Sequence, residues 1–368
     1  MLFFGVSKIK VLLAIDSLVA GGAQRQLILL YRHLRMKNYD TKFLIHNDKV
    51  FYNIERENLL VIDRKSQSKI STIFSYIKQL SDQRPDVVIA YGGNAAVMAE
   101  LSSIFVKSYK LIISERNLRP NHSFISLFAR RIMHYFLADE FFVNSESQRR
   151  NLAVTAPFLD CHVVLNTLDH SFFPSGRSKA IESEMNILGL GKYLPQKNII
   201  FFIELVKCLV ARKPNIRVNV RWYGDEDGKD KRHYKERCQT LISANSLDSV
   251  VSLHSEVSDV EALYQWASVL VLPSISEGTP NVALEAMAHG IPICLSDVSD
   301  NERLIEDDKN GYLLSLDDAA QWADAISSIM TWDSQRVDTC RRTSEKILNS
   351  HYGYSNLDKI EGLIRGIS

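Results

Sequence analysis

One stretch of the chain, residues 269–297, constrains the fold more than any other. It begins with the apolar run Val269–Leu272, which has the length of a buried strand. The polar, flexible segment Ser274–Thr279 follows, and then the nearly all-apolar segment Val282–Ala288, which predicts a short buried helix. A second apolar run, Ile291–Leu295, predicts the next strand. Strand, loop, helix and strand in this order form a βαβ unit, so the sequence predicts an α/β protein with parallel sheets.

Two carboxylates in this stretch indicate a ligand site. Glu277 lies in the predicted loop, and Glu285 is the one charged residue of the predicted helix. Pro280 suits the first turn of that helix, whose amide N–H groups at Asn281 and Val282 have no acceptor within the helix and attract phosphate. The unit therefore offers a phosphate site and two carboxylates that can accept hydroxyl groups, as a nucleotide-sugar requires.

A structural explanation of Glu285 competes with this one. A carboxylate on a buried helix needs a partner, and an Arg or Lys side chain is the commoner partner in proteins. The spacing favours a ligand, because residues 277–292 follow the long pattern E-G-x-P-N-x-x-x-E-A-M-A-x-G-x-P.

This pattern resembles the donor-site signature of glycosyltransferase family 4, whose members are retaining transferases of the GT-B fold. The resemblance implies that Glu277 binds the hydroxyls of the donor sugar and that Glu285 binds the ribose hydroxyls. The donor-binding residues that it implies in this stretch are Glu285, Gly278, Thr279, Pro280, Asn281 and Val282.

A second motif follows the predicted strand Met185–Leu190. The letters GLGKYL lack the third glycine of a dinucleotide-binding loop, since Leu194 stands in its place, so a nicotinamide cofactor is not expected. The segment resembles the family loop G-R-L-x-P-x-K-N instead. Lys192 takes the place of the Arg and Lys197 that of the Lys, and both are expected to neutralise the donor diphosphate. The alternative is a pair of solvent-exposed lysines. Lys197 is assigned to catalysis together with Glu277.

The first half of the chain alternates predicted strands and helices and so predicts a doubly wound parallel sheet. Its first strand leads into Gly21 and Gly22 within GGAQRQ, which resembles the glycine-rich loop of the family and is expected to face the donor. Ligands of such sheets lie at the carboxyl ends of strands. Three residues at such ends, Glu115, Arg116 and Asn166, are candidates for the acceptor side. Glu115 and Arg116 are expected to pair with each other, unless Glu115 binds an acceptor hydroxyl.

Two domains are expected. Residues 1–175 form an amino-terminal Rossmann-like acceptor domain, and residues 176–345 form a carboxy-terminal donor domain. Residues 168–184 contain Pro174 and Gly176 and predict the linker. The family resemblance implies that the helix in residues 346–368 crosses back to the first domain, and that the two domains face each other across a cleft.

Charge and composition limit the kinds of partner that the sequence predicts. Residues 1–175 contain 22 Lys and Arg against 15 Asp and Glu, which suggests an anionic partner or ordinary variation. The segment Phe124–Phe142 interleaves aromatic and basic residues, so its helix either packs on the sheet or lies on a bilayer. No apolar run has the length of a transmembrane helix. The five scattered cysteines favour a reducing compartment. The location expected is cytoplasmic and peripheral, at the inner face of a bacterial cytoplasmic membrane.

The function expected is retaining transfer of a sugar from a nucleotide-sugar, with UDP or GDP as the nucleotide, to a hydroxyl of a lipid-linked glycan acceptor in polysaccharide or lipopolysaccharide synthesis. No metal and no cofactor are expected, because two lysines and a helix N-terminus can replace a divalent ion. A sugar-nucleotide epimerase of the same fold and a non-catalytic nucleotide-sugar or glycan-binding protein are the alternatives. A nucleic-acid partner is not expected, since neither a clustered aromatic platform nor a basic run supports one.

Overall fold

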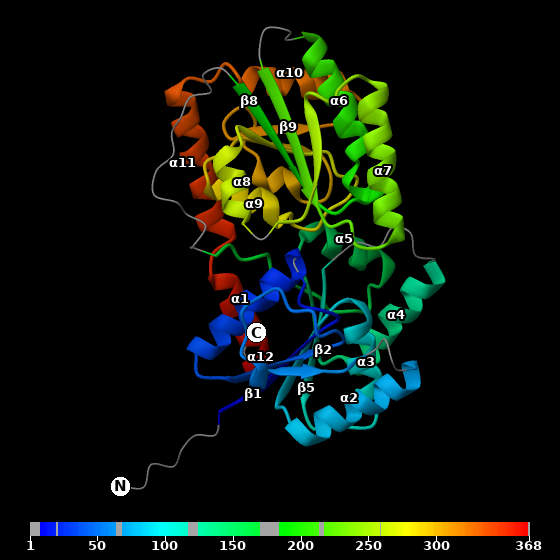
Figure 1. Ribbon diagram of the computed structural model, residues 1–368. Helices are drawn as coiled ribbons and strands as arrows, with labels where there is room; N and C mark the ends of the chain where they lie inside the picture. The colour runs from blue at the N-terminus through cyan, green and yellow to red at the C-terminus, as the bar shows by residue number, and fades with distance from the viewer. Residues whose placement is uncertain are drawn as a thin grey trace. The chain divides into compact units, whose positions relative to one another are not determined.

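The computed structural model describes residues 8–19, 21–63, 68–116, 124–169, 184–212, 217–257 and 259–366. The chain forms two compact units (Figure 1). Unit 1 consists of Met1–Thr167 and Tyr354–Ser368, and unit 2 consists of Leu168–Gly353. Most of the predicted linker, residues 170–183, lies outside the described residues.

Unit 1 is built on a seven-stranded parallel sheet of order β3-β2-β1-β4-β5-β6-β7. Its strands are β1 (Lys10–Ile15), β2 (Asp40–Ile45), β3 (Leu59–Val61), β4 (Val87–Tyr91), β5 (Lys110–Glu115), β6 (Glu140–Val143) and β7 (His162–Val163). The helices are α1 (Gly22–Met36), α2 (Lys69–Gln83), α3 (Gly93–Ser103), α4 (Phe124–Leu137), α5 (Glu146–Thr155) and α12 (Ser355–Arg365).

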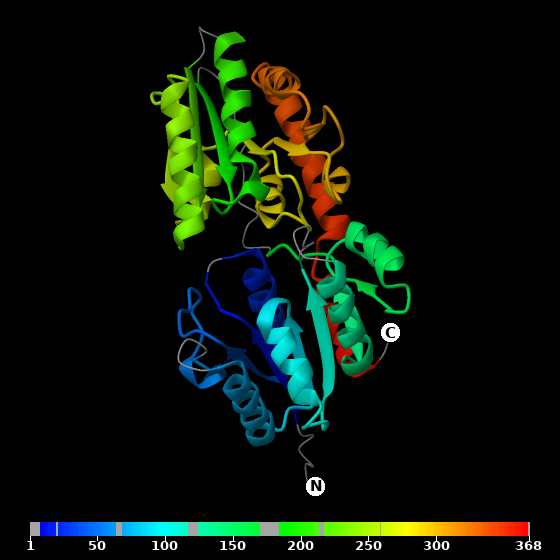
Figure 2. The same ribbon diagram turned by 90° about the vertical axis from the view of Figure 1, so that its right-hand side faces the viewer.

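Helices cover both faces of this sheet, because successive side chains of each strand point to opposite sides. In β1, Leu13 belongs to the core that includes α1 and α12, whereas Leu12 belongs to the core that includes α2 and α3. Figure 2 shows α2, α3 and the neighbouring helices beside the strands of unit 1. The expected doubly wound sheet is confirmed.

Unit 2 is built on a six-stranded parallel sheet of order β10-β9-β8-β11-β12-β13. Its strands are β8 (Glu184–Leu190), β9 (Arg217–Gly224), β10 (Val251–Ser255), β11 (Val269–Leu272), β12 (Ile293–Ser296) and β13 (Gly311–Leu314). The helices are α6 (Ile199–Arg212), α7 (Lys229–Ala244), α8 (Val260–Trp266), α9 (Asn281–Ala288), α10 (Ala319–Ile329) and α11 (Ser334–His351), and a 3-10 turn spans Pro195–Lys197. The βαβ unit predicted from residues 269–297 is present as β11, α9 and β12.

The pairing of strands in unit 2 depends on close backbone approach. A Cβ atom added to Gly311 would lie 1.8 Å from the carbonyl oxygen of Ile293 in β12, and the φ angle of Gly311 is +151°. A glycine is therefore required where β13 joins the sheet. The expected strand Ile291–Leu295 begins at Ile293 instead, and Pro292 before it has no N–H to donate to a neighbouring strand.

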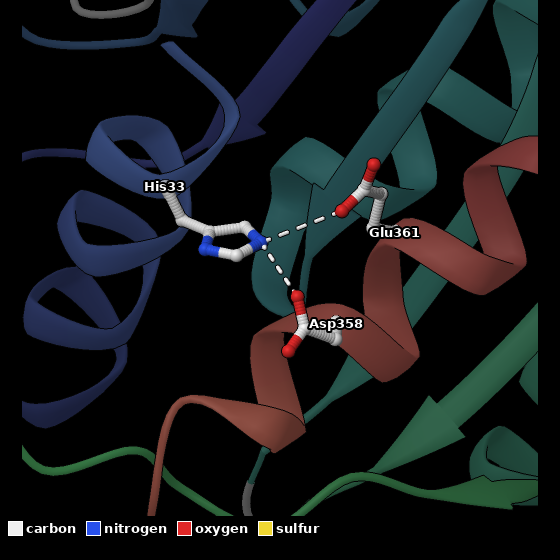
Figure 3. Close-up of side chains that lie close together, drawn as sticks. All are labelled: His33, Asp358 and Glu361. Carbon is white, nitrogen blue, oxygen red and sulfur yellow. Dashed lines mark ion pairs between the residues drawn. The ribbon is translucent and has the colours of Figure 1, made fainter. Parts of the chain in front are cut away.

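Helix α12 is held in unit 1 by a group of charged side chains that join it to α1 (Figure 3). His33 of α1 lies with its Nε2 atom 3.4 Å from Asp358 Oδ1 and 3.6 Å from Glu361 Oε2. Glu361 also accepts a hydrogen bond of 3.0 Å from the Tyr39 hydroxyl, and Arg365 pairs with it at 2.7 Å. Apolar residues of the same helix, among them Leu357 and Ile360, belong to the core of unit 1. A carboxy-terminal segment thus completes the amino-terminal sheet domain.

Candidate functional site

The loop after β11 carries Glu277, and its backbone is fixed from two sides. The N–H of Glu277 donates to Ser299 Oγ at 3.2 Å, and the Ser299 hydroxyl donates back to the Glu277 carbonyl at 2.6 Å. The Gln196 side chain donates through Nε2 to the Ser276 backbone carbonyl at 2.7 Å. The backbone carbonyl of Gln196 accepts the Ile275 N–H at 2.8 Å. The loop after β8 and the loop after β11 are therefore one connected structure.

That connection brings Lys197 and Glu277 together, although 80 positions separate them in sequence. The Lys197 ammonium lies 2.5 Å from Glu277 Oε1, and the two side chains are 18% and 10% exposed. A Cβ atom on Gly191 would lie 2.9 Å from Lys197 Cε, so a glycine leaves room for the lysine side chain. The two residues assigned to catalysis from the sequence are thus neighbours in unit 2.

Lys192 lies near this pair, and its pKa is lowered. The largest cause is desolvation, and the cations Lys231 and Lys197 act in the same direction, whereas Asp225 opposes them. Asp225 itself is ion-paired with Lys231. Desolvation raises its pKa, but the hydrogen bonds from Lys231 and the Asp227 N–H, together with the charges of Lys231 and Lys192, outweigh desolvation and lower the pKa. Lys197 and Lys231 are thus ion-paired with carboxylates, whereas Lys192 is exposed to solvent at the carboxyl end of β8.

Glu285 is 1% exposed in the middle of α9. Its Oε2 atom accepts a hydrogen bond of 2.7 Å from the hydroxyl of Tyr264 on α8. The partner in this hydrogen bond is therefore a neutral tyrosine and not the Arg or Lys of the structural explanation. A neutral donor satisfies part of the hydrogen-bonding capacity of a carboxylate.

The N-terminus of α9 lies next to the same loop. The Ala283 and Leu284 N–H groups donate to the Pro280 carbonyl, and Pro280 caps the helix without a side-chain acceptor. Thr279 and Pro280 are buried, and Gly278, Asn281 and Val282 are half-buried. The predicted donor residues after β11 thus form one continuous segment at a helix N-terminus, where negative charge is stabilised.

The sequence analysis missed three residues that position this site. Tyr264 holds Glu285, Ser299 holds the backbone of Glu277, and Gln196 holds Ser276. Gln196 is adjacent to Lys197 in the motif quoted above, so its position in sequence could have indicated that it lies at the site. Tyr264 and Ser299 belong to other segments, and no spacing rule connects them to the motif.

The glycine pairs of unit 1 differ in what they approach. Gly92 is the N-cap of α3 and Gly93 is its first residue, and the carboxylate of Asp16 caps this helix by accepting the N–H groups of Asn94 at 3.2 Å and Ala95 at 2.9 Å. An internal carboxylate therefore occupies the N-terminus of α3. The position before α1 is different, because Gly21 is its N-cap and supplies no side-chain acceptor. Gly21 and Gly22 stay predicted donor contacts.

The expected pairing of Glu115 with Arg116 is wrong. Glu115 pairs with Arg131 of α4, whereas Arg116 Nη2 donates to Asn166 Oδ1 at 2.5 Å and lies 5.0 Å from the centre of the Tyr91 ring. Adjacent residues at the end of an extended strand point to opposite faces of the sheet, which explains the separation. The structure thus brings Arg116 and Asn166 together and places Glu115 with α4.

Helix α4 has one buried and one exposed face, so it packs within unit 1, and its contact with a bilayer stays a prediction. Arg131 and His134 are buried, and His134 pairs with the buried Glu100 of α3. Phe128, Tyr135 and Phe136 are exposed. Among the described residues, no helix is long and apolar enough to cross a membrane.

The group of His33, Asp358 and Glu361 has side chains close enough to share a metal ion (Figure 3). Two cations already neutralise its carboxylates, since Lys37 lies 3.7 Å from Asp358 and Arg365 lies 2.7 Å from Glu361. This arrangement fits an ion-pair cluster that attaches α12.

Comparisons with known proteins match the part of the chain that contains these residues. Residues 184–331, which contain Lys192, Lys197, Glu277 and Glu285, match the family model described as Glycosyl transferases group 1. A Campylobacter jejuni protein named as an α-1,4-N-acetyl-D-galactosaminyltransferase that acts on a diphosphoundecaprenol-linked sugar is 24% identical over 359 residues, which cover 92% of this chain and 93% of that protein.

Residues 184–331 of this chain belong to the group 1 glycosyltransferases. An Escherichia coli relative is named as a galactosyltransferase that uses UDP-galactose and a diphosphoundecaprenol-linked GlcNAc, and is 27% identical over 174 residues, covering 47% of this chain and 43% of that protein. Among solved structures, Anabaena HepE in complex with UDP and glucose has a TM-score of 0.83 at 16% identity and covers 97% of this chain and 100% of its own. The fold of this glycosyltransferase is GT-B, as the sequence predicted.

Proposed function

We propose that this glycosyltransferase moves a hexose-type sugar from a nucleotide-sugar to an acceptor hydroxyl with retention of the anomeric configuration. The observation that carries the proposal is the Lys197–Glu277 pair, held between the loops that follow β8 and β11. A lysine ammonium and a carboxylate at one position can bind the leaving phosphate and the sugar hydroxyls of the same donor.

The donor diphosphate would be bound by Lys192, Lys197 and the N–H groups at the start of α9, without a divalent metal. Charge-assisted hydrogen bonds from ammonium groups and the positive end of a helix dipole would stabilise the negative charge that develops on the leaving group. Gly21 and Gly22 are kept as proposed donor contacts. Glu285 would accept the ribose hydroxyls, and the Tyr264 hydroxyl would keep its carboxylate oriented.

Glu277 suits a positioning role better than a nucleophilic one. Its carboxylate is ion-paired with Lys197, and an ion pair lowers the reactivity of a carboxylate towards carbon. We propose that the acceptor hydroxyl attacks from the face that the phosphate leaves, and that a phosphate oxygen takes the hydroxyl proton. The product then keeps the configuration of the donor, which proton NMR of the anomeric position measures directly.

The acceptor would be a sugar on a lipid diphosphate at the inner face of a bacterial cytoplasmic membrane, in the synthesis of a surface polysaccharide such as O-antigen or other lipopolysaccharide. The printed names of the Campylobacter jejuni and Escherichia coli relatives support an acceptor of this class. UDP is the favoured nucleotide and GDP the second, because HepE was solved with UDP and the Escherichia coli relative uses a UDP-sugar.

A face of unit 1 supports contact with an anionic bilayer. The helices α2, α3 and α4 adjoin each other in unit 1 (Figure 1). On α2, α4 and the turn after α3, large apolar side chains are exposed, namely Ile70, Phe74, Ile104, Phe105, Phe128, Tyr135 and Phe136. The exposed charged residues of α2 and of this turn are Lys69, Lys78 and Lys107 against Asp82. Aromatic and basic side chains together fit a bilayer that contains anionic lipid.

The donor proposal is tested by thermal unfolding with UDP, GDP, ADP, CMP and their sugar conjugates. We expect one nucleotide to raise the Tm of the wild type and Glu285→Ala to abolish that rise. Glu277→Ala should remove the further rise produced by the sugar. If no nucleotide raises the Tm, the transferase proposal fails. Formation of an isomeric sugar-nucleotide from the donor alone would favour an epimerase instead.

The membrane proposal is tested by sedimentation with phosphatidylglycerol vesicles at low salt. We expect the wild type to sediment with the vesicles and the double variant Phe74→Ser, Phe136→Ser to stay in solution. Met36→Ser is the matched control, because Met36 is an exposed apolar residue at the end of α1. Equal sedimentation of all three proteins would contradict a role for this face.

A further inference from the structure

Arg116 follows β5 in unit 1 and is 7% exposed. Its guanidinium makes a hydrogen bond of 2.5 Å to the side-chain oxygen of Asn166 and lies 5.0 Å from the centre of the Tyr91 ring. Both partners are neutral. Burial lowers the pKa of Arg116, with Tyr91 as the opposing influence, but an arginine stays protonated in proteins. Arg116 is therefore a buried positive charge whose contacts in the described structure are neutral groups.

Other buried charges of unit 1 are neutralised by the chain itself. Arg131 is paired with Glu115, and His134 is hydrogen-bonded to Glu100. In the described part of the chain, no carboxylate forms an ion pair with Arg116. The preceding residue, Glu115, carries a carboxylate, but that carboxylate is paired with Arg131 of α4. Since a buried charge without a counter-ion is unfavourable, its retention indicates that a counter-ion arrives from outside the chain.

The surroundings of Arg116 are compatible with binding of a counter-ion from solution. Arg116 is buried but still 7% exposed, so a small part of the residue reaches solvent. Asn144, after β6, donates through Nδ2 to the same oxygen of Asn166 at 3.4 Å. The backbone carbonyl of Asn166 accepts Asn356 Nδ2 of α12 at 3.4 Å. Asn166 is thus held in place, and it orients the guanidinium at the carboxyl edge of the sheet, where ligands of such sheets bind.

We propose that Arg116 binds a phosphate or diphosphate group of a substrate at the carboxyl edge of the unit 1 sheet. A planar guanidinium can donate two parallel hydrogen bonds to a phosphate, and one nitrogen is already oriented by Asn166. The anion supplies the counter-charge that the described chain does not. The inference rests on the proposed function in one respect, namely that the anion belongs to a substrate. Both the lipid-linked acceptor and the nucleotide-sugar carry a diphosphate, so the experiment has to distinguish them.

The test uses the full chain and three probes: inorganic pyrophosphate, UDP, and geranyl diphosphate as a water-soluble prenyl diphosphate. Binding is measured by calorimetry for the wild type, Arg116→Gln, Arg116→Lys and the control Arg35→Gln, an exposed arginine of α1. We expect Arg116→Gln to weaken binding of at least one organic diphosphate by about 10- to 100-fold, as loss of a charge-assisted hydrogen bond implies. Arg116→Lys keeps the charge and loses the bidentate geometry, so it should lie between the two.

The pattern of losses identifies the source of the anion. Weaker binding of geranyl diphosphate with unchanged UDP binding assigns Arg116 to the acceptor, and the reverse assigns it to the donor. Equal affinities for all probes in Arg116→Gln and the wild type would overturn the proposal, as would a wild type that binds none of the three or an equal loss in Arg35→Gln.

The Tm without ligand gives a second measurement. If Arg116 only supported the fold, its replacement would lower this Tm, whereas a ligand-binding role predicts no such loss. We expect Arg116→Gln to unfold at the same temperature as the wild type or at a higher one, because the substitution removes an uncompensated buried charge. A lower Tm together with unchanged diphosphate affinity would show that Arg116 only supports the fold. Sugar transfer by the wild type is assayed separately. If the wild type transfers no sugar but Arg116→Gln still binds diphosphate more weakly than the wild type, the proposed function is refuted and the anion site is confirmed.

Discussion

The Lys197–Glu277 ion pair gives a prediction whose size follows from the structure. The ammonium and carboxylate lie 2.5 Å apart, and the side chains are 18% and 10% exposed. Exposed pairs contribute about 0.2 to 1 kcal/mol, whereas removal of one partner of a fully buried pair destabilises a protein by about 3 to 5 kcal/mol. The partial burial of this pair lies between these limits. We expect a coupling free energy of about 2 kcal/mol between the two residues.

A double-mutant cycle measures that coupling. The four proteins are the wild type, Lys197→Met, Glu277→Gln and the double variant, each unfolded by urea. All four tryptophans of the chain, Trp222, Trp266, Trp322 and Trp332, belong to unit 2, so their fluorescence reports the unit that contains the pair. We expect each single variant to lose stability and the double variant to lose less than the sum of the two.

The same variants separate the structural contribution of the pair from its catalytic one. The double variant should be more stable than the sum of the two single effects predicts, but it should not regain sugar transfer, because it lacks the ammonium that we propose stabilises the leaving diphosphate. We expect Lys197→Met to lower turnover by about 100-fold or more, comparable to removal of one oxyanion-stabilising donor. A coupling below about 0.5 kcal/mol, or a Lys197→Met enzyme with unchanged turnover, would refute this reasoning.

Three further predictions concern stability and metal dependence. Hydrogen bonds from Tyr39 and Arg365 outweigh burial and lower the pKa of Glu361. Its contribution to stability is therefore present above the ordinary glutamate pKa of about 4.3 and is lost as the pH falls through the lower folded-state pKa. Glu361→Gln should destabilise the protein by about 2 kcal/mol near pH 7, and this difference should shrink in urea titrations at pH values below that range. Gly311→Ala should destabilise unit 2 by about 3 kcal/mol or more, through backbone strain and displacement of β13 from β12, as tryptophan fluorescence in urea would show. Sugar transfer should be unchanged after dialysis against EDTA, and a loss that Mg²⁺ or Mn²⁺ restores would contradict the proposal that lysines replace a metal.

Much of the fold followed from local sequence because both sheets are parallel and buried. Strands such as Val87–Tyr91 and Val269–Leu272 are continuous apolar runs, and the polar segments between them contain the turn residues that end them. Boundaries were less accurate where a strand pairs weakly. The strand β7 has two residues, His162–Val163, because it lies at the edge of the sheet and pairs with β6 alone among the described strands.

The candidate site was predictable where one motif contained it and not where two segments meet. Glu277 and Lys197 each stand in a recognisable motif, but their contact depends on Gln196, which joins the loops after two strands that are adjacent in the sheet but distant in sequence. The partner of Arg116 was misjudged for a related reason. Proximity in sequence favoured Glu115, whereas the alternation of side chains along a strand gives Glu115 to α4 and leaves Arg116 beside Asn166.

The return of α12 to unit 1 affects how a nascent chain can fold. The core of unit 1 includes Leu357, Ile360, Leu363 and Ile364, which leave the ribosome after all of unit 2 has been synthesised. At about 5 to 20 residues per second, the interval amounts to roughly 10 to 40 seconds. During that time the apolar surface against which α12 later packs is uncovered, so the domain that is translated first is the one completed last. Chaperone dependence during synthesis should accordingly arise from the amino-terminal half of the molecule.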